Sequence, residues 1–154
     1  MTAASDLAAT AKAYDPPKLG EKFAAQSFGP RSLDDLRRYA SASGDDNPIH
    51  LDPELAQRAG LAAPPVHGML LMSQFAPALA IWRPDLTLIR LSGKFLRPIF
   101  VGETAELSGR VVQIALGASP DEQSTFLLRL MMHNERREIA LIAEALTLRQ
   151  TGIN

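Results

Sequence analysis

The chain has 154 residues, of which 46% are hydrophobic, and its formal charge at pH 7 is −1. This length is typical of one domain with a sizeable core, and so small a charge gives no electrostatic basis for binding nucleic acid or an anionic membrane. The sequence contains no cysteine, which excludes disulfides, thiol catalysis and cysteine-ligated zinc, and fits a cytoplasmic protein.

The N-terminal part of the chain predicts a lead-in, one strand and one helix. Residues 1–13 are rich in alanine and lack the basic start and apolar run of a signal peptide, and we expect residues 1–18 to be flexible. Lys22–Phe28 predicts the first strand. Ser32 is typical of a helix N-cap, with Asp35 as a shorter substitute for the glutamate of a capping box. One face of the helix that follows carries Leu33, Leu36, Tyr39 and Ala40.

The next stretch, Ser-Gly-Asp-Asp-Asn-Pro-Ile-His at residues 43–50, gathers a carboxylate, an amide and an imidazole in one short turn. Asp45 and His50 can converge only if the chain folds back between them. Asn47-Pro48 favours such a turn, because asparagine bonds to nearby backbone and proline fixes φ. The loop is therefore able to direct both side chains at one point. From the residues alone, a turn acid and a surface histidine remain the alternative interpretation.

Metal binding is a further interpretation of this acidic loop. Counted from Asp45, the glycine at the sixth position and the glutamate at the twelfth position of a calcium loop are missing. Zinc is also poorly supported, because the chain has three histidines and no cysteine. We therefore expect no metal.

A second short helix should begin after Asp52, which supplies an N-cap acid before Pro53, and should stop at Gly60. Val66–Trp82 then forms the apolar centre of the chain. It is hydrophobic on nearly every side, which predicts a buried helix. Pro77 should kink or divide that helix, because it removes the bond to the Ser73 carbonyl. A membrane span is a weaker interpretation, because the run is short and contains this proline.

The remainder of the chain predicts strands, at Leu86–Phe95, Thr104–Arg110, Ser124–His133 and Glu138–Arg149. Gly109 predicts a bulge, because the alternation of polar and apolar residues breaks just after it. One face of the third of these strands carries Phe126, Leu128, Leu130 and Met132. The fold class that follows is α+β in a single domain, with an antiparallel sheet of about five strands wrapped around a central buried helix.

The motif at residues 43–50, followed by Asp52-Pro53, Ala59-Gly60 and Pro65-x-His67-Gly68-Met69, resembles the MaoC-like hydratases, which include the (R)-specific enoyl-CoA hydratases. The stretch from Phe95 to Glu103, Phe-x-Arg-Pro-Ile-Phe-Val-Gly-Glu, resembles the same family. The resemblance covers residues 33–112. It implies the hotdog fold over residues 1–154, and family members with a single hotdog domain are usually homodimers.

The resemblance implies that Asp45 and His50 are the catalytic pair. They would add water across a trans-2-enoyl thioester to give an (R)-3-hydroxyacyl thioester, or catalyse the reverse. A carboxylate and an imidazole can share the roles of base and acid, and the sequence leaves open which does which. Gly68 would open the central helix and point its N–H at the thioester carbonyl. No cofactor is implied, because coenzyme A serves only as the carrier of the substrate.

The other candidate site residues have alternatives. Asn47 is expected to brace the loop, and His67 to orient the turn into the helix. The methionines are expected in the core or the acyl tunnel, and the basic residues either at the phosphates of coenzyme A or on a solvated sheet edge. At Ala76, where some hydratases of this family carry a hydroxyl, this chain departs from the pattern, so the acyl chain length stays open. The full candidate substrate-binding set is Asn47, His67, Met69, Met72, Lys94 and Arg97.

Four functions follow from these expectations. An (R)-specific enoyl-CoA hydratase leads, and a dehydratase of acyl-carrier-protein thioesters is the close alternative. A catalytically silent hotdog subunit is the third, which the intact Asp45, Asn47 and His50 disfavour. A hotdog thioesterase is the fourth. It normally uses an acid on or near the central helix, and Gly68–Trp82 contains none.

Overall fold

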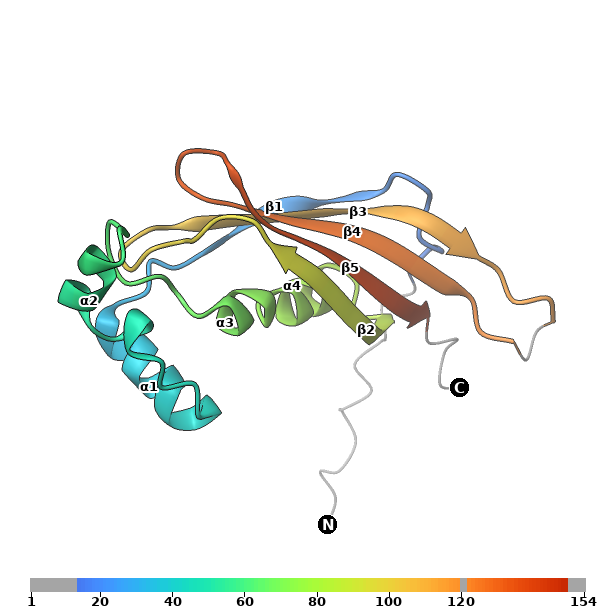
Figure 1. The fold of residues 1–154 in the computed structure, drawn as a ribbon. Coiled ribbons are helices and arrows are strands. Elements are labelled where there is room, and N and C mark those ends of the chain that lie inside the picture. Colours follow the sequence, from blue (N-terminus) through green and yellow to red (C-terminus); the bar gives the residue numbers. More distant parts are fainter. Residues whose placement is uncertain (1–13, 120–121, 150–154) are drawn as a thin grey trace, which may run out of the picture.

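The computed structural model describes residues 14–119 and 122–149 and consists of one antiparallel sheet that lies over a central helix (Figure 1). The strands are β1 (Lys22–Phe28), β2 (Leu86–Phe95), β3 (Ala105–Ala115), β4 (Thr125–His133) and β5 (Ile139–Arg149). Their order across the sheet is β1-β3-β4-β5-β2. The predicted α+β class, with about five strands around one helix, is confirmed. The expected lead-in lies outside the described residues up to residue 13.

The core forms between the sheet and the central helix. The predicted inward face of β4 is confirmed, because every second side chain from Phe126 to Met132 is at most 1% exposed. Strand residues alternate between faces, so one buried face follows directly from the sequence pattern. The helix residues in the same core cluster are Leu71, Met72, Phe75, Ala78 and Leu79.

The central helix is divided into α3 (Gly68–Met72) and α4 (Phe75–Trp82). The division lies at Ser73, four residues before Pro77. The backbone nitrogen of Pro77 has no hydrogen to donate to the Ser73 carbonyl, and the proline ring would clash with that carbonyl. The predicted kink or division is therefore confirmed. The prediction that the central helix is buried on every side is wrong for the single chain, because Met69 is 59% and Ile81 is 76% exposed. The helix thus presents one apolar face to the core and a second one outward.

Two further helices lie beyond one end of the sheet, α1 (Leu33–Ser43) and α2 (Pro53–Arg58), and a 3-10 turn, η1 (Pro48–His50), stands between them (Figure 1). The predicted capping box at the start of α1 is confirmed, with Ser32 and Asp35 each accepting from the other's backbone N–H. Asp52 caps α2 as expected. These caps satisfy amides that would otherwise lack partners at the helix starts.

The predicted irregularity at Gly109 is present on one side of β3 only. The register between β1 and β3 shifts directly after the Phe23–Gly109 pair, with the extra residue on β1, whereas the register between β3 and β4 shifts later, between Val111 and Gln113. A Cβ atom on Gly109 would lie 2.2 Å from a ring carbon of Phe23, so glycine is needed there because the aromatic ring from β1 packs directly on the backbone. The extra β3 residue opposite β4 is Val112, where the two adjacent valines break the alternation.

At the opposite end of the sheet, Arg83 is 5% exposed and holds several segments together. Its guanidinium donates to the Asp85 carboxylate at 2.6 and 2.7 Å and to the Asp15 carbonyl at 2.7 Å. Arg149 donates to the carbonyl of Tyr14 and, at 3.3 Å, to Asp85. Within the lead-in that we expected to be flexible to residue 18, the backbone at Tyr14 and Asp15 is therefore attached to the sheet.

Candidate active site

The polar loop, residues 43–50, is shaped by hydrogen bonds between its own side chains and backbone. Gly44 caps the C-terminal end of α1, and its positive φ of 80° turns the chain sharply. The amide of Asp45 donates to the Ser43 hydroxyl at 3.2 Å. The side-chain oxygen of Asn47 accepts from the amide of Ile49 at 3.1 Å. The predicted bracing contact of Asn47 is therefore present, and it begins the turn that brings the next histidine back toward the carboxylate.

His50 has a fixed tautomer. Its Nδ1 lies 2.7 Å from the carbonyl oxygen of Pro65, and a carbonyl can only accept, so Nδ1 carries the proton and donates it. That carbonyl is itself held in place, because the neighbouring Val66 amide donates to Ile99 at 2.8 Å. The Nε2 atom of neutral His50 is consequently left with a lone pair that can accept a proton.

His67 is completely buried, with 0% of its surface exposed. Its Nε2 donates to the backbone carbonyl of Asp45 at 3.0 Å. The ring stacks on that of His50, with centroids 4.1 Å apart, and its centroid lies 4.8 Å from that of Tyr39. Burial lowers the pKa of His67 below its usual value of 6.5, so this side chain is neutral at pH 7.

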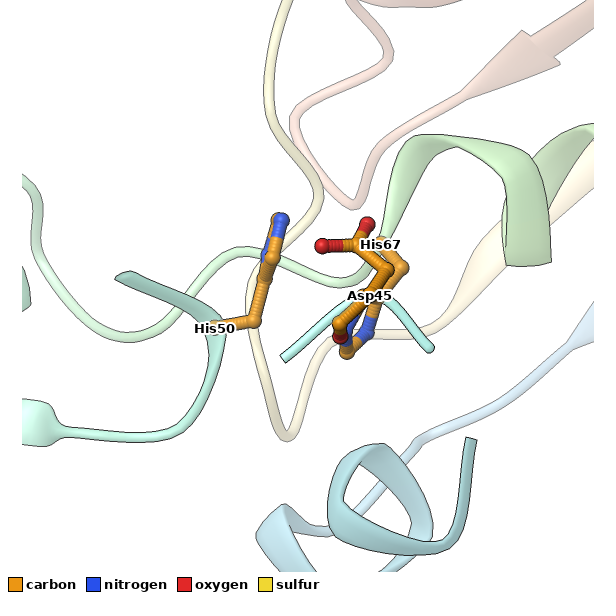
Figure 2. A group of neighbouring side chains, drawn as sticks. All are labelled: Asp45, His50 and His67. Carbon is orange, nitrogen blue, oxygen red and sulfur yellow. The ribbon is translucent and has the colours of Figure 1, made fainter. Parts of the chain in front are cut away.

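Figure 2 shows the side chains of Asp45, His50 and His67 gathered at one place although they come from three separate segments. A carboxylate oxygen of Asp45 and one ring nitrogen of each histidine all lie within 4.8 Å of one another. No hydrogen bond joins the Asp45 carboxylate directly to the His50 ring in the described part of the chain. A water molecule that donates to two acceptors at about 2.8 Å each lies between atoms roughly 4.5 Å apart. The spacing of this cluster therefore fits one bridging water. Asp45 is exposed and His50 half-buried, so water can reach both.

The same three side chains are potential metal ligands, since zinc binds imidazole nitrogen and carboxylate oxygen. The two imidazole planes, however, are inclined by only 25° and stacked. Because the lone pair of a ring nitrogen lies in the plane of the ring, stacked rings direct their lone pairs side by side rather than at one ion. Metal binding here would require one ring to turn. The expectation of no metal stays a prediction.

Gly68 opens α3, as predicted, and its amide has no hydrogen-bond partner among the described residues. It lines a cavity of about 300 Å³ together with Phe95, Arg97 and four apolar or proline residues. The Phe95 ring lies directly over Gly68, because an added Cβ would stand 3.0 Å from two of its ring carbons. The described cavity therefore has a free backbone donor on one side and an aromatic wall on the other.

The structure separates the remaining predicted site residues. Met72 is 8% exposed and belongs to the core, whereas Met69 lies on the outer side of the helix. Arg97 lines the Gly68 cavity and pairs loosely with Glu138 at 3.8 Å. Lys94 lines a different cavity of about 530 Å³. Their contact with a substrate stays a prediction.

Three features of the site were missed by reasoning from the sequence. These are the ring of Tyr39 against His67, the Pro65 carbonyl that fixes His50, and the ring of Phe95 above Gly68. Tyr39 did stand out as part of the apolar face of α1, which marks it as packed but not as a neighbour of a histidine. A backbone carbonyl carries no sequence signal at all.

Comparison with known proteins gives one family and several relatives. The family model described as a MaoC-like domain matches residues 15–125. A mitochondrial 3-hydroxyacyl-acyl-carrier-protein dehydratase of Arabidopsis thaliana is 39% identical over 85 residues, which are 55% of this chain and 50% of the relative. An (R)-specific enoyl-CoA hydratase of Aeromonas caviae is 42% identical over 77 residues, covering 47% of this chain and 58% of the relative. The chain thus spans about half the length of these curated relatives.

Among solved structures, the (R)-hydratase of A. caviae involved in PHA biosynthesis superposes with a TM-score of 0.75 and 26% identity. The superposition covers 87% of this chain and 98% of that one. The similarity in fold therefore extends over most of this chain.

Proposed function

Because the chain belongs to the MaoC-like domain family, we propose that it is a hydro-lyase that adds water to a trans-2-enoyl thioester and gives the (R)-3-hydroxyacyl thioester, or catalyses the reverse dehydration. The observation that carries the proposal is the pairing of the Asp45 carboxylate with His50, whose Nδ1 is occupied by the Pro65 carbonyl at 2.7 Å. Two proton acceptors thus face one accessible space.

In the proposed reaction a single water lies between the Asp45 carboxylate and Nε2 of His50. One of its protons passes to this pair as its oxygen bonds to C3 of the substrate. The electrons of the double bond move to C2 and the thioester carbonyl, and a proton from the pair then adds to C2. Because the same pair handles both protons, oxygen and hydrogen arrive on one face of the double bond, which is syn addition.

The proposed site for the thioester carbonyl is the backbone N–H of Gly68. Negative charge develops on this oxygen when water attacks C3, and a fixed backbone donor at a helix start stabilises such charge. The absence of a side chain allows the carbonyl to approach closely. The free amide and the adjoining cavity of about 300 Å³ support this assignment.

Coenzyme A is the carrier that we propose first, and acyl carrier protein is the alternative. One relative is an enoyl-CoA hydratase and another a dehydratase of carrier-protein thioesters, so the family supports both. Arg97, which is exposed beside the Gly68 cavity, supports an anionic carrier in either form. The proposed reaction is acid–base chemistry without a further cofactor.

We also propose a homodimer. The outward face of α3 and α4 and the adjacent β2 edge expose large apolar side chains, which a second copy would cover. They are Met69, Ile81, Ile89, Phe95 and Leu96, between 49% and 76% exposed. No helix in the described ranges is long and apolar enough to cross a membrane. The absence of cysteine supports a cytoplasmic location as part of the same proposal.

The activity is tested by incubating purified protein with crotonyl-CoA, following the loss of the enoyl-thioester absorbance and determining the chirality of the product. We expect (R)-3-hydroxybutyryl-CoA from the wild type and formation slower by about 10²-fold or more from Asp45→Asn, which has the same shape but no proton-accepting carboxylate. An (S) product would contradict the proposal. So would inactivity on crotonyl, longer enoyl and carrier-protein thioesters alike.

The carrier is tested by comparing kcat/KM for crotonyl-CoA with that for crotonyl thioester on acyl carrier protein. A higher value for the coenzyme A thioester supports the leading assignment. A higher value for the carrier-protein thioester moves the chain to the dehydratase alternative. A thioesterase would instead release free thiol, which a thiol reagent detects in the same reaction.

A further inference from the structure

The His67 side chain contacts both members of the proposed catalytic pair. Its Nε2–H donates to the Asp45 carbonyl at 3.0 Å, and its ring lies against the ring of His50. It comes from the start of α3, whereas Asp45 follows α1 and His50 lies in η1. Three segments that are separate in the sequence are therefore joined through this imidazole.

The position of His67 is itself fixed. It is completely buried, and Tyr39 from α1 packs its ring at 4.8 Å between centroids. A ring held between two other rings cannot change rotamer without displacing one of them. The titratable groups beside it include His50 and the exposed Asp45, and neither they nor Tyr39 donate to its second nitrogen.

That second nitrogen, Nδ1, is buried and has no hydrogen-bond partner among the described residues. An unpaired polar atom in the interior costs folding free energy, so an apolar ring would serve packing better. The Asp45 carbonyl that Nε2 binds lies in a part-buried bond of an exposed residue, so this one hydrogen bond offsets only part of the cost of the unpaired nitrogen. Stability alone therefore does not account for a histidine at this position.

We propose that His67 is a positioning residue that couples the two catalytic groups, holding the backbone of Asp45 with its Nε2–H and supporting the ring of His50 with its face. This inference rests on the proposed function. Nδ1–H donation to Pro65 fixes His50 within the plane of its ring, and the stacked His67 prevents the ring from tilting out of that plane. Together these contacts set the distance between the carboxylate and Nε2 of His50.

The test uses two substitutions that separate the contacts. His67→Phe keeps an aromatic ring in the stack and removes the donor to Asp45. His67→Gln removes the ring but keeps an N–H near the position of Nε2. We expect His67→Phe to lower kcat on the order of 10²-fold, because small displacements of a catalytic group have effects of this size. KM should change little, the melting temperature should stay or rise, and His67→Gln should recover part of kcat.

His133→Phe is the matched control, because it makes the same substitution at a half-buried histidine on β4. It should leave kcat unchanged. Full kcat in His67→Phe would overturn the proposal. Parallel losses of kcat and melting temperature would also overturn it, since they would make His67 a purely structural residue.

A second measurement is independent of activity. Nitrogen-15 NMR of the imidazole rings should show His67 neutral, with its proton on Nε2. A proton on Nδ1 would overturn the proposal, because the bond to the Asp45 carbonyl would then be impossible. A wild type without hydratase activity that shows the Nε2–H tautomer would contradict the proposed reaction but agree with the His67 geometry.

Discussion

Two backbone carbonyl groups hold the proposed reactive residues in position. The Pro65 carbonyl fixes the tautomer of His50 through a bond of 2.7 Å, and the Asp45 carbonyl accepts from His67 at 3.0 Å. Neither bond uses the atoms that the proposed chemistry requires, namely the carboxylate of Asp45 and Nε2 of His50. The site is therefore preorganised through contacts that leave its reactive atoms free.

Replacing Gly68 with alanine should reduce turnover without unfolding the protein. The added methyl group would lie beside the free amide and 3.0 Å from two ring carbons of Phe95. Phe95 is 49% exposed, so its ring can move away, and the φ of Gly68 is not among the positive values that strain an alanine. We expect kcat for crotonyl-CoA to fall by at least about tenfold, which corresponds to about 1.4 kcal/mol, with an unchanged melting temperature.

The double variant Gly68→Ala/Phe95→Ala identifies the cause of this loss. If the methyl group blocks the thioester carbonyl, removing the ring of Phe95 restores nothing. Recovery of kcat would instead show that a displaced Phe95 was responsible. A collapse of the melting temperature in Gly68→Ala would contradict the assignment and make Gly68 a structural residue.

At the level of elements, predictions from the sequence succeed where the determining signal is local. The Ser32 cap, the division of the central helix before Pro77 and the alternation in β4 are all encoded within a few residues. The requirement for glycine at residue 109 has no local signal, because its cause, the ring of Phe23, comes from another strand. The site follows the same rule. Asp45, Asn47 and His50 stand in one motif, but the bond between His67 and the Asp45 carbonyl spans 22 residues and has no local signature.

The end of the sheet opposite the polar loop depends on the Arg83–Asp85 pair, which ties α4 to β2 and β5. Burial raises the pKa of Asp85, but the hydrogen bonds and charge of Arg83 outweigh this and hold the pKa below its usual 3.8. The carboxylate therefore binds protons more weakly in the folded state than in the unfolded one. Its contribution to stability is fully present above pH 3.8 and is lost as the pH falls through the lowered pKa.

Asp85→Asn should destabilise the protein, because it leaves the buried Arg83 with Glu21 at 3.3 Å as its remaining carboxylate partner. Breaking a buried pair costs about 3 kcal/mol, which corresponds to a fall in melting temperature of roughly 6–12 °C at this size. Thermal melts at neutral pH and at pH 3 measure the effect, and the difference between variant and wild type should shrink at the lower pH. Asp34→Asn, which breaks an exposed pair with Arg37, is the control and should change little. Equal melting temperatures for both variants would contradict the structural role of Asp85.

At the scale of the whole molecule, the hydrophobicity of the central helix exceeds what one chain can bury. Its inner side packs under the sheet, while the outer side and the β2 edge remain apolar and exposed. A second copy that packs against this surface would bury both, and the Phe95 wall of the Gly68 cavity lies within the same surface. In the proposed dimer, the interface and the proposed site would therefore share Phe95.

Ile81→Lys should convert the proposed dimer into a monomer, because it places a charge among the exposed apolar side chains of the proposed interface. Ile81 is 76% exposed, and Leu116 beyond the end of β3 is 75% exposed, so Leu116→Lys is a matched control for a general effect on solubility. Sedimentation velocity of all three proteins over a range of concentrations measures the outcome. A monomeric wild type, or dissociation in both variants alike, would contradict the proposed interface.

A double-mutant comparison of initial rates with crotonyl-CoA determines whether Asp45 and His50 act together on one water. Asp45→Ala and His50→Ala should each lower kcat by roughly 10²–10⁴-fold, the range expected for loss of a general acid or base. The double variant should be little slower than the slower single variant, because groups that work as a unit lose their function together. Losses that multiply would show that the two residues act independently and would contradict the account.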